Sequence, residues 1–496
     1  MSFAKRFGRG LLWNQLSRFI ELGAAYAASV IAARALGAQA FGVYSVALSA
    51  VTLSYFGTSL GLNEILNVNV PRLREHPGRI AHLLRAVLGT RALVALGLAA
   101  VFALGAPLMA RAYHEPALVP LFRVAAVYVC FYNVSLLLEY FHMGAMQVPR
   151  VSAARLVVQA LGLAAAIATL VFHWPAAWLL ASLAGASMIG VTILAAGAAA
   201  ELRAPGQAFD LKPLRAFGYT IWATSFVTFF LGRQSDVLLI GYLKPGTSEA
   251  GWYAAASLLV NLLASALLMG TEGVSLAAFS ELEQRVDRAG LGTLWSLHLK
   301  LDQLLSIPLL VFGARFAGDI VRLLYAASFS PAAVLLTAYT LAWVIARITG
   351  GGTNMTVLYA IGRPRVPLIL YGVSGISNLV LNLILIPRFG GLGAVMGTGI
   401  AITGSSIASS ILVARHTGTS LPLGFSLKLL LACGAALLAV QWLPHLAGLA
   451  GLAVAGVVGL VVCLGALALL RPFDAADKRL LARLNPRVGA LAARLG

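Results

Sequence analysis

Charge is scarce in this sequence of 496 residues: only 11% are Asp, Glu, Lys or Arg, whereas 60% are hydrophobic. Average soluble domains are about one-quarter charged, so a chain of this length cannot cover several globular cores with a wettable surface. The scarcity of charge excludes a soluble multidomain enzyme. A mean hydropathy of +0.89 indicates a membrane protein instead.

Cysteine is rarer still, and Cys130, Cys433 and Cys463 all lie in apolar stretches. They form neither a disulfide framework nor a zinc site. The eight histidines are scattered without a second ligand at metal spacing, and no glycine-rich loop is followed by Lys and Ser or Thr. We therefore expect no metal, no cofactor and no direct use of ATP. Base-stacking and groove-reading elements are also missing, so no nucleic-acid partner is expected.

Long apolar runs are what the sequence has in abundance. Lipid cannot satisfy an exposed backbone, so these runs predict an all-α fold, a polytopic integral membrane protein. Each run of about 20 residues is bounded by proline, glycine or charge. The fourteen predicted spans are 11–33, 41–66, 85–109, 119–141, 150–171, 175–199, 216–241, 249–271, 303–324, 332–358, 366–386, 392–413, 425–443 and 447–470.

The lysines and arginines between these spans predict the orientation of the chain. If both termini are cytoplasmic, the inside connections hold 22 of them and the outside connections 5. Positive residues are retained on the cytoplasmic side, so we expect both termini there. Most of the net charge of +19 is thereby explained as a topology signal.

An internal repeat predicts the domain organisation. A shift of 209 residues superimposes Trp13 on Trp222, Gly23 on Gly232, Gly37 on Gly246, Gly42 on Gly251 and Tyr44 on Tyr253. We predict two parallel six-helix halves, 1–200 and 201–420, two further spans in 421–470, and a cytoplasmic amphipathic tail in 471–496. Parallel repeats of secondary transporters place the substrate near the membrane midplane, where the repeats meet.

Glycines interrupt the tenth predicted span. Gly350, Gly351 and Gly352 would let that helix bend during a conformational cycle, and a close helix crossing is the alternative. Asn133 and Asn354 each begin a glycosylation sequon. Because both lie inside predicted spans, we interpret these sequons as chance.

Two segments resemble a known family. They are Arg34 to Tyr44, with its echo from Gly246 to Tyr253, and Asn382 to Ala394. Both resemble the polysaccharide transporters of the multidrug/oligosaccharidyl-lipid/polysaccharide exporter superfamily, which includes Wzx-like and MurJ-like flippases. The similarity extends over about the first 415 residues. It implies transport of undecaprenyl-pyrophosphate-linked sugars across the bacterial inner membrane.

The charges inside the predicted spans carry the functional information, because each costs roughly 2.5–3.5 kcal/mol at a helix centre unless it faces water or a partner. Cations outnumber acids nine to six. The cations are Arg18, Arg85, Arg91, Arg123, Arg155, Arg233, Lys300, Arg315 and Arg347, and the acids are Glu21, Glu64, Glu139, Asp236, Glu272 and Asp302.

Four arginines are the candidate pyrophosphate ligands, since a guanidinium fork matches phosphate oxygens and keeps its proton. Arg347 ranks first because it lies mid-span without an acid on its own helix; Arg18, Arg91 and Arg233 follow. Arg18 also matches the first-span position at which MurJ-like flippases carry cavity arginines. Glu21 and Asp236, each three residues after an arginine, are candidates for counter-charge or coupling.

The function expected is therefore a flippase that moves lipid-linked oligosaccharide from the inner to the outer leaflet by alternating access. Its partners would be that lipid, the surrounding membrane lipids, and polysaccharide polymerases or glycosyltransferases. Coupling to protons, sodium ions or the membrane potential stays open. One alternative is a cation-coupled multidrug exporter, which would present acids to organic cations. The other is a membrane-bound polymerase or ligase, although the longest outward connection, 110–118, offers few groups for catalysis.

Overall fold

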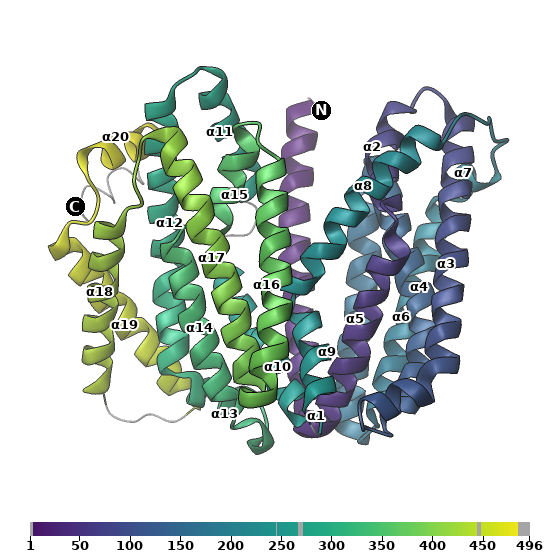
Figure 1. Cartoon of the computed structure of the whole chain (residues 1–496), viewed down its shortest axis with the longest axis horizontal. Coiled ribbons are helices and arrows are strands. Elements are labelled where there is room, and N and C mark those ends of the chain that lie inside the picture. Colours follow the sequence, from purple (N-terminus) through teal and green to yellow (C-terminus); the bar gives the residue numbers. More distant parts are fainter. Residues whose placement is uncertain (1–2, 245, 266–270, 444–447, 485–496) are drawn as a thin grey trace. The chain divides into compact units, whose positions relative to one another are not determined.

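The computed structural model describes residues 3–244, 246–265, 271–443 and 448–484 (Figure 1). Side chains are described in these ranges except at 3–19, 220, 224–228, 231, 265, 271–274, 277, 476, 480 and 482–484. The described residues form helices and no strand, which confirms the predicted all-α membrane fold. The chain divides into two compact units, Met1–Ala254 and Ala255–Gly496.

The first unit is a helical bundle in which α3 packs on α4, α5 on α1, and α6 on both α4 and α5. Its helices are α1 (Phe3–Ser59), α2 (Leu62–Arg72), α3 (Pro77–Ala112), α4 (Leu118–Gly144), α5 (Val148–Phe172), α6 (Ala176–Gly197), α7 (Ala199–Arg203), α8 (Lys212–Thr228), η1 (Phe229–Leu231), α9 (Arg233–Leu243) and the first part of α10 (Ser248–Ser265).

The second unit packs α14 between α12 and α17, α16 against α17, and α18 against α19 and α12. After the end of α10 its helices are α11 (Thr271–Gln284), α12 (Arg288–Arg315), α13 (Ala317–Leu324), η2 (Ala327–Phe329), α14 (Ala332–Ile348), α15 (Gly351–Ala360), α16 (Arg365–Phe389), α17 (Gly391–Thr417), α18 (Leu423–Gln441), α19 (Gly448–Leu470) and α20 (Ala475–Leu484).

Eleven helices of the described chain are long and apolar enough to cross a membrane. The count differs from fourteen for three reasons. Helix α1 contains the first two predicted spans, the extended backbone of Gly232 divides the seventh span between η1 and α9, and the eighth is described only to Ser265. Large apolar side chains stay exposed on the outer helices, such as Leu104 on α3 (83%) and Leu469 on α19 (86%), as expected for surfaces that face lipid.

The repeated glycines share a backbone conformation. Gly37 interrupts α1 with φ 72°, and Gly246, its counterpart at a shift of 209, has φ 77°. A side chain is disfavoured at positive φ, so glycine is the residue that suits both turns. The repeat found in the sequence therefore corresponds to a repeated positive φ in the backbone.

Gly42 and Gly251, a second repeated pair, lie against each other in the first unit. A Cβ atom on Gly42 would lie 1.8 Å from the carbonyl oxygen of Thr247, and one on Gly251 would lie 2.3 Å from that of Ala38. Thr247 is itself the counterpart of Ala38 at the same shift of 209, so the contact is symmetric. Small residues let backbones approach this closely in membranes.

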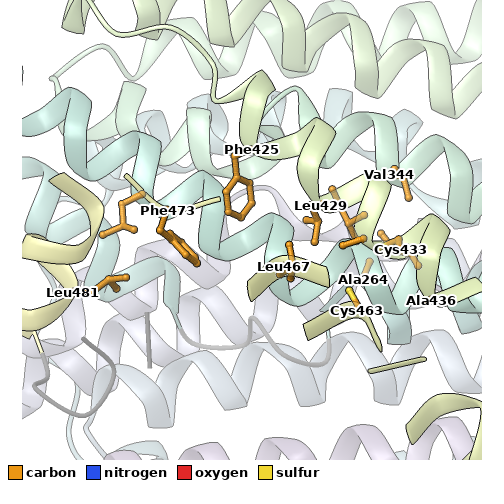
Figure 2. Packing of buried hydrophobic residues seen from close by; sticks show 14 residues of the cluster. Ala264, Val344, Phe425, Leu429, Cys433, Ala436, Cys463, Leu467, Phe473 and Leu481 are labelled. Carbon is orange, nitrogen blue, oxygen red and sulfur yellow. The ribbon is translucent and has the colours of Figure 1, made fainter. Parts of the chain in front are cut away.

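The core of the second unit joins the last helices to α12 (Figure 2). Phe473, just before α20, packs its ring near that of Phe425 on α18, and Leu481 on α20 is 3% exposed. The first part of the predicted tail is therefore buried against protein. The remainder of that tail, 485–496, lies outside the described residues.

The glycine contact makes a stability prediction. We expect Gly42→Ala to lower the free energy of unfolding by about 1–3 kcal/mol, because the added methyl group overpacks the crossing. Gly89→Ala on α3 is the control, since its Cβ would meet nothing within 4 Å. The measurement is thermal unfolding of the purified protein in detergent. Equal midpoints for the two variants would contradict a close crossing at Gly42.

Candidate functional site

Arg91 lies on α3 and joins the two ends of a broken helix. Its Nη1 donates to Thr58 Oγ1 at 2.9 Å, and its Nη2 donates to Asn63 Oδ1 at 2.7 Å. Between these partners, Leu60 and Gly61 have left-handed φ angles of 44° and 69°, which separate α1 from α2. The two guanidinium nitrogens thus connect the last turn of α1 to the first turn of α2.

A wider polar network surrounds this break. Asn133 on α4 accepts a hydrogen bond from Thr58 at 2.6 Å, and its amide donates to Ser54 at 2.9 Å. Arg91 is completely buried, and its guanidinium carbon lies 5.7 Å from the centre of the Tyr55 ring. Arg91 therefore organises the break in this conformation and does not face water.

Two polar atoms near the break have no hydrogen-bond partner among the described residues: Nε of Arg91 and Oε2 of Glu64. Both atoms are buried. Unsatisfied buried groups are costly, so these two atoms destabilise this conformation of the break.

Arg155 also pairs within the first unit. Its Nε and Nη2 both donate to Oε2 of Glu139 on α4, at 2.9 and 2.8 Å. The two side chains are 28% and 10% exposed. This neighbour on another helix neutralises a charge that sits in an apolar span.

Arg347, the first candidate ligand, forms an ion pair in the second unit. Its Nη1 donates to both carboxylate oxygens of Asp302 on α12, at 2.9 and 3.2 Å. Its Nη2 donates to the carbonyl oxygen of Ala264 at 2.8 Å, and its guanidinium lies 5.4 Å from the Trp343 ring centre. The arginine side chain is 14% exposed and the aspartate 6%. In this conformation, then, the charge of Arg347 is compensated by an acid from the adjacent helix.

The glycine run follows Arg347 directly and interrupts the helix. Gly350 and Gly351 have φ angles of 93° and 35°, and they separate α14 from α15. Asn354, fully buried, donates to the carbonyl oxygen of Thr349 at 3.1 Å and accepts from Trp295 at 3.0 Å. This asparagine satisfies part of the interrupted backbone, as a break at membrane depth requires.

The other candidates have contacts of their own or lie outside the described side chains. Asp236 on α9 is fully buried and accepts a hydrogen bond from the hydroxyl of Tyr253. Arg233, on the same helix, donates to the carbonyl oxygen of Ala254 at 3.5 Å. Glu21 is partly buried on α1, and the side chain of Arg18 lies outside the described residues. Among the described side chains, Arg91 and Arg233 belong to the first unit and Arg347 to the second.

The structural roles of two asparagines in these networks were not predicted from the sequence. Asn133 and Asn354 were treated as chance sequons, yet both are fully buried in hydrogen-bonded networks. The available signal was the polar amide inside an apolar span, because buried polar groups need partners.

A third polar cluster anchors α20. Lys300 on α12 donates to Asp474 at 3.0 Å and to Asp477 at 2.6 Å. The backbone amides of both aspartates bond to each other's carboxylates, which forms a capping box at the start of α20. Lys300 lies two residues before Asp302 on α12, so this helix contacts both α20 and Arg347.

The Arg347 pair makes a quantitative prediction. We expect Arg347→Gln and Asp302→Asn each to cost about 3–5 kcal/mol of stability, because each leaves a buried charge unpaired. The double variant should cost clearly less than the sum of the two. The exposed pair of Arg285 and Glu281 is the control, with a coupling of about 0.3–0.5 kcal/mol. Additive losses in a double-mutant cycle at Arg347 would contradict the pairing.

The Arg91 fork makes a second prediction. Arg91→Lys should cost about 1–3 kcal/mol, because one ammonium cannot replace both guanidinium contacts at Thr58 and Asn63. The same change at Arg111, an exposed residue near the end of α3, should leave stability unchanged. Chemical unfolding of both variants in detergent compares them, and an unaffected Arg91→Lys variant would rule out a bridging role.

Comparisons with known proteins place this geometry in context. Residues 12–334 match the sequence profile of a family described as polysaccharide biosynthesis protein. This match confirms the resemblance found in the sequence. No curated protein matches the chain.

Solved structures of a flippase and of transporters share the fold. A lipid II flippase MurJ in an inward closed conformation is 13% identical, with a TM-score of 0.74 over 92% of this chain and 98% of that one. An inward-facing multidrug resistance MATE transporter of the MOP superfamily is 10% identical, with a TM-score of 0.68 over 80% and 94%. A MOP superfamily transporter from Pyrococcus furiosus is 11% identical, with a TM-score of 0.55 over 82% and 94%. At these identities the likeness is one of fold.

Proposed function

Because the chain belongs to the polysaccharide biosynthesis protein family, we propose that it is a flippase for undecaprenyl-pyrophosphate-linked oligosaccharide. It carries this lipid from the inner to the outer leaflet of the bacterial cytoplasmic membrane by alternating access. The family match over residues 12–334 is the observation that carries the proposal. The fold shared with a lipid II flippase supports it, since that protein is named for a lipid-linked cargo.

The chemistry of Arg347 suits this cargo. In the described conformation Nη1 of Arg347 donates to both oxygens of Asp302, and Nη2 donates to the carbonyl oxygen of Ala264. A pyrophosphate also presents anionic oxygens that accept hydrogen bonds from a guanidinium, so it can replace the carboxylate without leaving the arginine bare in the membrane. An exchange of one anion for another costs less than uncovering a buried cation.

The break after Arg347 supplies a place for movement. Gly350 and Gly351 lie three and four residues after Arg347, at the break between α14 and α15. A rotation of α14 about this break withdraws the guanidinium from Asp302 and offers it to the phosphate. Movements of this kind concentrate at short irregular segments between rigid helices. Arg91, Arg18 and Arg233 are the further cation positions in this proposal, with Glu21 and Asp236 as counter-charges.

The multidrug exporter is the second candidate because a MATE transporter shares the fold. The excess of cations over acids inside the predicted spans favours an anionic cargo. Export of organic cations from cells that express the protein, at rates above an empty vector, would reverse this preference.

The flippase proposal predicts a change of leaflet. In cells that lack the protein, the sugar-bearing lipid should remain on the inner leaflet, out of reach of a membrane-impermeant sugar oxidant. Expression of the wild type should restore labelling. Lipid that is labelled at normal levels without the protein would contradict the proposal.

Variants refine the same assay. Arg347→Ala should abolish restoration even when labelling is normalised to the amount of folded protein in the membrane, because the pyrophosphate loses its ligand. Arg363→Ala, a change in the turn after α15, should restore labelling fully. Full activity of Arg347→Ala would remove that arginine from the site and leave the flippase proposal standing.

A further inference from the structure

Two cavities of the second unit meet at the end of α12. The first, which we call the mouth, has a volume of about 510 Å³ and is lined by the ends of α12, α13, α18 and α19. The second, the slot, has a volume of about 240 Å³ and lies among α12, α18 and α19. Val440 and Leu452 line both cavities. The mouth therefore leads directly into the slot.

The mouth is lined by apolar and charged side chains and carries a net positive charge. Its charged residues are Arg315, Asp319 and Arg322. Arg322 donates to Asp319 at 2.5 Å, so these two charges compensate each other. Arg315 lies 5.1 Å from the ring centre of Phe316 and has no hydrogen-bond or ion-pair partner among the described residues. One guanidinium fork is thus available to an anion.

The slot is apolar and is kept open by glycine. Apart from Cys433 and Cys463, its lining residues are apolar side chains and glycines. Cys433, Ala436 and Cys463 of this lining are labelled in Figure 2. A Cβ on Gly456 would lie 3.7 Å from Phe312, and one on Gly459 would lie 3.6 Å from Val440. These are ordinary van der Waals distances for a Cβ atom. A side chain larger than a methyl group at either glycine would therefore extend into the slot. A cavity without polar groups excludes water and accepts hydrocarbon.

The depth of the two cavities matches the layers of a bilayer. Arg315 is the last residue of α12, Gln441 is the last residue of α18, and Gly448 is the first residue of α19. The mouth therefore lies where these three spans meet the membrane surface. Pro308 in the slot lies seven residues deeper on α12, or about 10 Å at 1.5 Å per residue. A headgroup at the mouth would therefore place its chain in the slot.

We propose that the mouth and slot bind an anionic phospholipid, with its phosphate at Arg315 and one acyl chain beside Phe312. The ligand belongs to the leaflet at which α12 ends. A free phosphate gains nothing from the slot, whereas a phospholipid uses both cavities. The bound lipid ties the α18–α19 pair to α12, and this role is independent of the cargo that the protein moves.

The test measures the equilibrium binding of lipids to the delipidated full-length protein. Native mass spectrometry detects the bound lipid. Phosphatidylglycerol should bind about fivefold more tightly than phosphatidylcholine with the same chains, the preference expected for one arginine near a headgroup. Arg315→Gln should remove this preference, Arg315→Lys should retain most of it, and Arg111→Gln should leave it unchanged. Size-exclusion chromatography checks that each variant is folded.

The slot has its own matched pair of variants. Gly456→Leu should weaken the binding of both lipids, because the side chain occupies the place of the acyl chain. Gly465→Leu on the same helix should not, since its Cβ would meet nothing within 4 Å. Equal loss in both variants would overturn the slot as the acyl site.

Competition distinguishes the sources of a phosphate group. Inorganic phosphate at millimolar concentration should leave phosphatidylglycerol bound. If it displaces the lipid, the mouth is a site for free anions and the proposal fails. Undecaprenyl pyrophosphate and unlabelled phosphatidylglycerol are compared as competitors of bound phosphatidylglycerol. If undecaprenyl pyrophosphate competes at the lower concentration, the site belongs to the transported lipid and the proposal is overturned.

Discussion

A cation inside a bilayer needs an anion or a polar partner close by, and this requirement shapes the interior of the protein. Arg155 meets Glu139, and Arg347 meets Asp302, in each case across two helices. A partner on the same helix would leave neighbouring spans free to separate. Partners on different helices couple the electrostatics of the arginine to the packing of the bundle, so any movement that separates the helices must also supply a new anion.

The same requirement governs the backbone. Helix breaks occur at Leu60–Gly61 and at Gly350–Gly351, and polar side chains surround both. Arg91 bridges the first break, and Asn354 satisfies the second. Irregular backbone at membrane depth is tolerated where the protein itself supplies the hydrogen bonds. In discontinuous helices of transporters such places also bind cargo, which is why the break beside Arg347 is central to the proposed function.

The spans and the fold class were predictable from the sequence because hydropathy and backbone satisfaction are local properties. The glycine run at 350–352 coincides with the break between α14 and α15. The partner of Arg347 was beyond reach of the same reasoning. Asp302 lies 45 positions away on α12, and only packing of α12 against α14 brings the two charges together. The burial of Arg91 could not be predicted from the sequence either, because it also depends on how the helices pack.

The sequence by itself determined that this chain is an all-α membrane protein, that its glycines repeat at a shift of 209, and that cations exceed acids inside the spans. Each of these follows from composition or from residues that are neighbours along the chain. Only the tertiary structure decided which arginine is paired, which is buried, and that Lys300 holds α20 through Asp474 and Asp477. Charge compensation depends on distances of a few ångströms between helices, and sequence separation carries no information about such distances.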